Sequence, residues 1–261
     1  MQSIEKATAL TPFLRQVRTA SESVLLLDYD GTLAPFQIDR SLAYPYFGVV
    51  SLLDGITRCG RTRIIIISGR PIVELRALLT PMNEIEMWGS HGLEHQLSDG
   101  SYSRVQVSED DDAVLREAEK WVEATGLLSR TELKHGGIAI HWRGMPPAEA
   151  RRIQDLTQDG WTPLAERSGL KLLKFEAGLE LRVSHPDKGD AVRTILETLD
   201  DTVPIAFLGD DLTDEDAFRV LRGRGLTVLV RTDFRETHAV AWIRPPAELI
   251  DFLESWRRNA C

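Results

Sequence analysis

The sequence predicts an α/β fold in which a Rossmann-like parallel sheet carries a smaller inserted α/β module. The four isoleucines at 64–67 are too hydrophobic for a half-exposed strand, so they indicate a strand buried on both faces, and four apolar residues predict another short buried strand at 24–28. A third buried strand is predicted at 203–208. Segments with helical periodicity separate these strands, and such alternation is typical of a parallel sheet flanked by helices.

The segment between these core strands has a different pattern. From about residue 96 it favours short strands, and we interpret it as a separate module with the order ββαβαββ. Its expected elements are a hairpin at 93–107 with Asp99 and Gly100 at its tip, a helix at 110–125, a strand at 131–143, a helix at 147–158 and two strands within 163–183. We therefore expect a core of residues 1–95 and 185–261 and an inserted domain of residues 96–184.

The rest of the core is expected to alternate between helices and strands. The predicted helices are 1–20 with an interruption at Pro12, 47–59, 71–79, 188–199, 214–222 and 246–257, and the further strands are 226–230 and 240–243. Residues 34–47, rich in proline and aromatic side chains, should form an irregular loop.

The composition excludes several classes of protein. The 261 residues carry a formal net charge of -9, which argues against nucleic-acid binding. No apolar run approaches the length of a membrane span, and the N-terminal residues lack the apolar core of a signal peptide. The two cysteines, Cys59 and Cys261, suggest neither a disulfide framework nor a zinc site. We expect a monomeric, cytoplasmic protein in a reduced compartment.

Two carboxylates follow the first buried strand. Asp28 and Asp30 are one residue apart and would face the same way on an extended segment, and Gly31 permits the turn that ends the strand. Two acids this close repel each other unless a cation lies between them. The pair suits a hard divalent ion and a carboxylate nucleophile. The alternative is an ordinary acidic turn, because Asp-x-Asp-Gly is common in loops.

The other two buried strands also end in polar residues, namely Ser68 and Asp210. The carboxyl ends of parallel strands meet at one crevice, so these residues are predicted to lie close to Asp28. The acidic run after Asp210 has a structural alternative, because Thr213 is a good N-cap and acids in the first turn of a helix complement its dipole. Lys188, at the start of a predicted helix, is a candidate for binding a phosphate.

Four motifs occur in order: DYDGTL (28–33), SGR (68–70), the lysine of DKG (188) and GDDLTDEDAF (209–218). They resemble those of the haloacid-dehalogenase-like (HAD) phosphatase superfamily, and the form of the last motif is similar to that of the trehalose-6-phosphate phosphatase family. The segments GSHGLE (89–94), IAIHWR (138–143) and ELR (180–182) agree with that family. The resemblance implies a HAD core with a cap domain of the C2 type.

The resemblance and the chemistry of these residue types imply the same roles. Asp28 is expected to attack phosphorus and form an aspartyl-phosphate, and Asp30 to act as general acid and base. Mg²⁺ would be held by Asp28, Asp30 through its backbone carbonyl, and Asp210, with Asp211 and Asp214 in contact with metal-bound water. Ser68 and Lys188 would bind the phosphoryl oxygens.

The implied activity is Mg²⁺-dependent hydrolysis of trehalose 6-phosphate, the last step of trehalose biosynthesis, with the inserted domain as a lid. The expected partner is therefore a small phosphosugar, without nucleic acid or membrane. The candidate substrate-binding residues are Gly69, Arg70, His91, Glu94, Lys134, His141, Arg143, Glu180 and Arg182. His141 and Arg143 have an alternative as the exposed side of a strand, and Glu180 and Arg182 as a surface ion pair. Glu180 is favoured because a carboxylate accepts hydrogen bonds from adjacent sugar hydroxyls.

Two other functions stay open. The inserted domain departs from the family at Trp142, Glu176 and Val183, where tyrosine, lysine and proline are common. These departures leave room for another glycosyl phosphate, such as glucosylglycerol phosphate or mannosyl-phosphoglycerate. An inactive phosphosugar-sensing homologue is the second alternative, although such a copy would usually lack Asp28 or Asp30.

Overall fold

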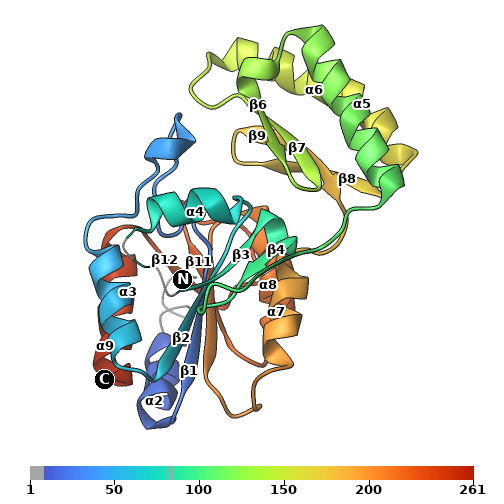
Figure 1. Ribbon diagram of the computed structural model, residues 1–261. Coiled ribbons are helices and arrows are strands. Elements are labelled where there is room, and N and C mark those ends of the chain that lie inside the picture. Colours follow the sequence, from blue (N-terminus) through green and yellow to red (C-terminus); the bar gives the residue numbers. More distant parts are fainter. Residues whose placement is uncertain (1–8, 81, 83–84) are drawn as a thin grey trace. The chain divides into compact units, whose positions relative to one another are not determined.

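The computed structural model describes residues 9–80, 82 and 85–261 and divides into two compact units (Figure 1). The core unit comprises Met1–Ser103 and Asp187–Cys261, and the inserted unit comprises Arg104–Pro186. Residues 96–103, which the sequence analysis assigned to the inserted domain, therefore belong to the core unit.

A mostly parallel sheet forms the centre of the core unit. Within the described residues it has eight strands in the order β12-β11-β10-β1-β2-β3-β4-β5. The parallel strands are β1 (Ser23–Leu27), β2 (Thr62–Ile67), β3 (Glu86–Gly89), β10 (Ile205–Gly209), β11 (Leu226–Val230) and β12 (Ala241–Ile243). At one edge, β4 (Glu94–Gln96) pairs antiparallel with β3, and β5 (Tyr102–Arg104) follows.

Helices cover both faces of this sheet (Figure 1). One face packs against α2 (Leu10–Thr19), α3 (Val49–Arg58), α4 (Ile72–Leu78) and α9 (Ala247–Ala260), and the other against α7 (Lys188–Leu196) and α8 (Glu215–Leu221). In β1, Leu25 and Leu27 join the first layer of side chains while Val24 and Leu26 join the second. Burial on both faces is why the strand is apolar at consecutive positions, and it confirms the predicted α/β fold class.

The inserted unit is a four-stranded antiparallel sheet with two helices. Its elements are α5 (Glu109–Thr125), β6 (Thr131–Lys134), β7 (Gly137–His141), α6 (Pro147–Glu166), β8 (Leu170–Phe175) and β9 (Gly178–Val183), with the sheet order β6-β7-β9-β8. α5 packs on β7 and β9, and α6 packs on β8 and β9. Ile138, Ile140, Leu179 and Leu181 are buried, so alternation in β7 and β9 leaves their polar residues for the other face.

Several predicted elements differ from the observed ones. The strand expected at 131–143 is the hairpin β6–β7, which turns at Gly136 with a φ of 72°. Helix α6 continues through Pro163 to Glu166, beyond the expected end at residue 158. The hairpin expected at 93–107 exists as β4 and β5, but it extends the core sheet, so the inserted unit has the order αββαββ.

Two further differences concern the core. Strand β3 was not predicted, because its four residues carry no recognisable alternation. In α2, Pro12 lies in the first turn, where proline is tolerated, and does not interrupt the helix. Of the helix expected at 1–20, residues 1–8 lie outside the described part of the chain.

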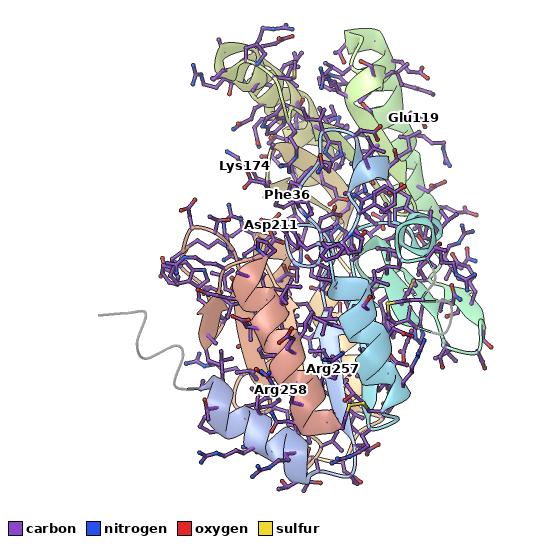
Figure 2. All side chains as sticks on the ribbon, turned by 90° about the vertical axis from the view of Figure 1, so that its left-hand side faces the viewer. Phe36, Glu119, Lys174, Asp211, Arg257 and Arg258 are labelled. Atoms are coloured by element: carbon purple, nitrogen blue, oxygen red, sulfur yellow. A yellow bond between two sulfur atoms is a disulfide. The ribbon has the colours of Figure 1, made fainter. Side chains whose placement is uncertain are left out.

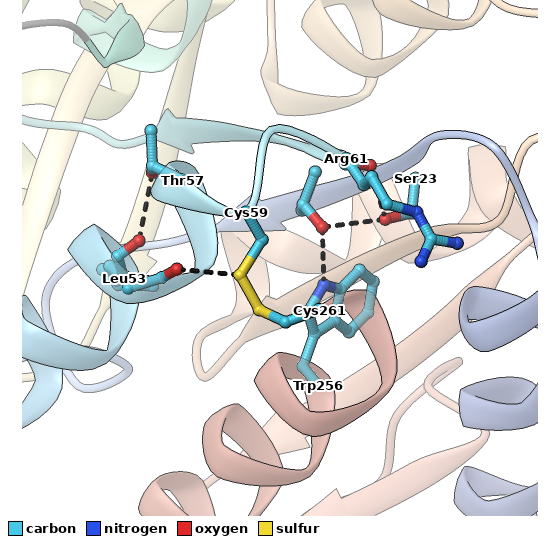
Figure 3. Close-up of a disulfide and its surroundings, with 9 residues drawn as sticks. Ser23, Leu53, Thr57, Cys59, Arg61, Trp256 and Cys261 are labelled. Carbon is cyan, nitrogen blue, oxygen red and sulfur yellow. Dashed lines mark hydrogen bonds between the residues drawn. A yellow bond between two sulfur atoms is a disulfide. The ribbon is translucent and has the colours of Figure 1, made fainter.

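Cys59 and Cys261 form a disulfide, which the sequence analysis did not expect (Figure 3). The two Cα atoms are 5.3 Å apart although 202 residues separate the cysteines in sequence. Cys59 follows α3 and Cys261 follows α9, and these helices pack against each other. Next to the disulfide, Trp256 of α9 donates a hydrogen bond of 3.1 Å to Thr62 at the start of β2. In the part of the chain that the structure describes, no helix is long and apolar enough to cross a membrane.

Candidate active site

The predicted residues lie directly after three neighbouring parallel strands of the core sheet. Asp28 follows β1, Ser68 follows β2 and Asp210 follows β10. Leu27 is in register with Ile66 on one side and with Leu208 on the other, so the three strands end at the same edge. Figure 2 shows Phe36 and Asp211 at this end of the core unit, and Arg257 and Arg258 of α9 nearer the opposite end.

Asp28 is buried between two hydrogen-bond donors. Its side chain is 5% exposed, and Lys188 Nζ donates to Oδ1 at 2.6 Å while Thr32 Oγ1 donates to Oδ2 at 3.2 Å. Burial raises the pKa of the Asp28 carboxyl to about 7, and the Lys188 ammonium opposes that rise. A carboxylate in this environment needs positive charge nearby to be a competent nucleophile.

Lys188 joins two carboxylates that are distant in sequence. Its ammonium donates to Asp28 and, at 2.7 Å, to Asp214 Oδ1, and its side chain is 3% exposed. Burial alone would lower the pKa of Lys188, but Asp214 and Asp28 hold it above its ordinary value. The lysine is the first residue of α7, whose N-cap Asp187 forms a capping box with Asp190. The helix start therefore fixes the lysine at the site.

Asp210 and Asp214 complete a cluster of carboxylates. One oxygen each of Asp28, Asp210 and Asp214 lies within 4.8 Å of the other two. Asp214 Oδ2 accepts the backbone N–H groups of Asp210 and Asp211, both at 2.9 Å. Asp210 Oδ2 is buried and accepts no hydrogen bond from the described residues, and Arg231 Nη1 lies 3.8 Å from it. Burial and the neighbouring Asp28 raise the pKa of Asp210 well above its ordinary value.

Gly31 allows Asp210 to approach the turn after β1. Its φ is +81°, and a Cβ at this position would lie 2.2 Å from Asp210 Oδ2. A larger residue would therefore be strained and would displace the carboxylate.

The cluster fits a hard divalent cation. Carboxylate oxygens are the ligands that such ions prefer, and a buried carboxylate oxygen without a donor is costly unless a cation lies next to it. Asp214, which is predicted to contact metal-bound water, has an oxygen within the same cluster. Asp211 accepts the N–H of Leu212 and caps the short 3₁₀ helix Leu212–Asp214, so Asp211 takes the capping role expected of Thr213.

Asp30 is paired with Arg70. The Arg70 guanidinium donates to both Asp30 oxygens, at 2.6 Å from Nε and 2.7 Å from Nη2, and donates to Glu74 at 3.1 Å. The Arg70 side chain is 2% exposed and that of Asp30 is 27% exposed. Arg70 is a predicted substrate-binding residue, and in the structure it contacts the predicted acid/base Asp30.

Segment 89–94 lies next to the turn that carries Ser68. The His91 ring packs on Gly69, where a Cβ would lie 2.6 Å from it, and His91 N–H donates to the Ser68 carbonyl at 3.0 Å. Ser68 is buried, and its Oγ accepts the N–H of Arg70 at 3.2 Å. Glu94 accepts hydrogen bonds from Ser90 Oγ and Ile72 N–H. His91 and Glu94, which are candidate substrate-binding residues, belong to the core unit.

The remaining predicted residues lie in the inserted unit. Lys134 forms an ion pair of 2.8 Å with Glu180, and His141 contacts Glu132 at 2.9 Å. The register aligns Glu132 with Ala139 and Ala139 with Glu180, so these polar side chains share one face of the sheet. Glu132 was not predicted as a site residue, although its position two residues before Lys134 indicates the same face.

Arg143 and Arg182 have a different kind of partner. Arg143 donates to the backbone carbonyl of Glu176 at 2.7 Å, and Arg182 donates to that of Pro186 at 3.5 Å. Arg182 is aligned with Gly137 and therefore lies on the same face as Glu180.

Comparison with known proteins first defines the class of the fold. A haloacid dehalogenase-like hydrolase from B. subtilis matches with a TM-score of 0.61 at 14% identity, over 89% of this chain and 99% of that one. The C-terminal domain of the C. albicans trehalose-6-phosphate phosphatase matches with a TM-score of 0.82 at 21% identity, over 95% of this chain and 96% of that one. The fold is therefore that of the HAD-like phosphatases, as predicted.

The sequence comparisons define the family. A family model described as trehalose-phosphatase matches residues 26–241. Trehalose-phosphate phosphatase B of Arabidopsis thaliana is 30% identical in an alignment 280 residues long, and the alignment covers 97% of this chain and 72% of that protein. The chain belongs to the trehalose-phosphatase family, and the resemblance seen in its motifs is confirmed.

Proposed function

We propose that this protein hydrolyses trehalose 6-phosphate to trehalose and phosphate, with Asp28 as the nucleophile. The observation that carries the proposal is the buried Asp28 carboxylate, hydrogen-bonded to Lys188 and clustered with Asp210 and Asp214. Membership of the trehalose-phosphatase family supports the substrate, and the reaction would be the last step of trehalose biosynthesis.

The reaction divides into two displacements at phosphorus. In the first, an Asp28 oxygen forms a bond to phosphorus, the bond to the sugar oxygen breaks, and Asp30 gives that oxygen a proton. In the second, Asp30 takes a proton from water, the water oxygen attacks phosphorus, and the bond to Asp28 breaks. Phosphate leaves, and both carboxylates return to their starting states.

Mg²⁺ is the proposed cofactor, held by Asp28, Asp210 and the Asp30 carbonyl, with Asp214 beside them. When bound, it supplies positive charge between the carboxylates and the phosphoryl group. Lys188 would donate to a phosphoryl oxygen from its place beside Asp28, and the Ser68 hydroxyl would donate to another. Gly69 has no side chain and therefore leaves room for the His91 ring beside the turn that carries Ser68.

Arg70 is proposed to position Asp30. Since the guanidinium contacts both carboxylate oxygens, it fixes the plane of the carboxylate while each oxygen keeps a lone pair for the sugar oxygen or water. Arg70 would thus act through Asp30 and not through the substrate.

The inserted unit is proposed to be the cap that recognises the sugar. The polar face with Lys134, His141, Glu180 and Arg182 offers donors and acceptors, and sugar hydroxyls use both. Arg143 would support this face through its bond to the carbonyl of Glu176. A cytoplasmic location and a monomeric state stay predictions.

The Asp28→Asn variant tests the proposal. Phosphate release from trehalose 6-phosphate in the presence of Mg²⁺ is expected to fall at least about 1,000-fold, because the amide is a very poor nucleophile. Circular dichroism would check that the variant is folded. Activity near that of the wild-type protein would contradict the assignment of Asp28. A panel including glucosylglycerol phosphate and mannosyl-phosphoglycerate would test the substrate, and a folded wild-type protein inactive on every member would support the sensing homologue.

A further inference from the structure

The segment after β11 contacts the turn that carries Asp210. In this segment, Arg235 donates to the backbone carbonyl of Asp210 at 3.2 Å from Nε and to that of Asp211 at 2.7 Å from Nη2. Arg235 belongs to none of the sequence motifs and is distant from Asp210 in sequence. Its side chain is 18% exposed.

Glu215 holds Arg235 in this position. The Glu215 carboxylate pairs with Arg235 Nη1 and also accepts hydrogen bonds from Thr237 Oγ1 at 2.7 Å and from the His238 N–H at 2.8 Å. Glu215 is buried and is the first residue of α8. One carboxylate thus joins three residues of the segment to the helix that follows the Asp210 turn.

Arg235 and Asp214 together satisfy the backbone of the turn. The N–H groups of Asp210 and Asp211 donate to Asp214 Oδ2, and their carbonyls accept from Arg235. These residues lie beyond the end of β10, where the sheet no longer supplies partners. These four groups belong to three consecutive peptide units, and none of the three can rotate without breaking a hydrogen bond.

We propose that Arg235, held by Glu215, is a positioning residue for the cation site. By fixing the two peptide units at Asp210 and Asp211, it keeps the Asp210 carboxylate against Gly31 and within reach of Asp28. The inference rests on the proposed function only in taking Mg²⁺ as the ion. Lysine cannot replace arginine fully, because a guanidinium presents a rigid fork to two carbonyls and an ammonium does not.

Arg224 is a matched control, because its contacts lie at the other end of β10. Arg224 donates to the carbonyls of Val203 at 2.9 Å and Asp200 at 2.8 Å, both before the start of β10. Arg224 and Arg235 thus make the same kind of contact, each with two backbone carbonyls, but only the contact of Arg235 lies at the end that carries Asp210. Loss of either should affect stability, and loss of Arg235 alone should affect cation binding.

The experiment measures Mg²⁺ binding to the full chain by isothermal titration calorimetry, without substrate. Arg235→Gln is expected to weaken the affinity about 10-fold or more, as is usual when a partner of a metal ligand is removed, and Arg235→Lys is expected to recover part of the loss. Arg224→Gln should leave the affinity within about 2-fold of wild type, because its contacts lie at the far end of the strand. Thermal melts of every variant, with and without Mg²⁺, report the stability separately.

The outcomes separate this inference from the proposed function. A folded Arg235→Gln variant that binds Mg²⁺ like the wild-type protein would overturn the positioning role, and so would an equal loss of affinity in Arg224→Gln. If Arg235→Gln does not fold, a folded Arg235→Lys variant with wild-type affinity has the same meaning. A wild-type protein that binds Mg²⁺ but releases no phosphate would contradict the proposed function and leave the role of Arg235 intact.

Discussion

The core site and the polar face of the inserted unit both contain charged side chains, but their donors and acceptors are balanced differently. In the core, the three carboxylates of Asp28, Asp210 and Asp214 gather around the ammonium of Lys188. In the inserted unit, Glu180 has Lys134 at 2.8 Å and Glu132 has His141 at 2.9 Å.

This difference teaches what each region can bind. Three buried carboxylates around one ammonium carry excess negative charge, and a cation offsets the cost of burying that charge. On the inserted face Glu180 and Glu132 each have a nitrogen partner of their own, so the need for a cation is smaller. The alternating donors and acceptors of that face match the hydroxyls of a neutral sugar. The core site is therefore suited to an ion and a phosphoryl group, and the inserted sheet to the uncharged part of the substrate.

The largest expected effect comes from removing the one ammonium of the core cluster, in Lys188→Met. Two buried carboxylates would lose their charged donor, so phosphate release should fall at least about 1,000-fold and the free energy of unfolding by about 3–5 kcal/mol. Phosphate assays and chemical denaturation measure the two effects. Lys120→Met, at an exposed lysine of helix α5, is the control and should change neither by much. Comparable effects in both variants would contradict the inference that the contacts of Lys188 with Asp28 and Asp214 cause the loss.

The next largest effect is expected for Arg70→Lys, which removes the two-point contact with Asp30. Turnover of trehalose 6-phosphate should fall about 100-fold, and that of p-nitrophenyl phosphate less, because the nitrophenolate leaves without a proton. Arg63→Lys is the control, since Arg63 pairs with Glu86 at 2.6 Å at the opposite end of β2. An equal loss on both substrates would argue against action through the general acid.

The sequence predicted the core site better than the inserted one for a physical reason. Asp28, Ser68 and Asp210 each follow a strand that is apolar on both faces, and parallel topology then brings the three strand ends together. Arg235 could not be predicted in this way, because its partners are the backbone carbonyls of a distant turn. Every residue has a backbone carbonyl, so the sequence does not indicate which carbonyls will accept a hydrogen bond from a distant side chain.

Other misses have related causes. The pairing of Cys59 with Cys261 depends on how α3 packs on α9, which no local pattern determines. In the inserted unit, helix α6 runs past Pro163. The hairpin β6–β7 lies within a segment interpreted as one alternating strand, although Gly136 and Gly137 mark its turn. The candidate sugar-binding residues there came mainly from the family resemblance.

A selective effect is expected for Glu180→Ala in the inserted unit. The change removes the partner of Lys134, so kcat/KM for trehalose 6-phosphate should fall about 10- to 100-fold, as is usual when a charged hydrogen-bonding group is lost from a binding site. Turnover of p-nitrophenyl phosphate, which has no sugar, should stay within about 2-fold of wild type. Steady-state kinetics on both substrates measure the difference, and Glu166→Ala at the end of α6 is the control. An equal loss on both substrates would show that Glu180 acts in catalysis or in folding. It would contradict the assignment of sugar recognition to the inserted unit and of catalysis to the core unit.

The smallest effect on activity is expected for Cys261→Ser, which alters the core unit away from either polar cluster. The disulfide closes a loop of about 200 residues, so its loss should lower the free energy of unfolding by about 2–4 kcal/mol, chiefly because the unfolded chain becomes less constrained. Phosphate release should stay within about 2-fold of wild type, since the carbonyls and carboxylates of the site lie at the other end of the sheet. Urea denaturation of the wild-type protein, oxidised and reduced, and of the variant measures the difference. Identical midpoints for the oxidised and reduced protein would show that the bond does not stabilise the core, and a large loss of activity would show that the two ends of the sheet are coupled.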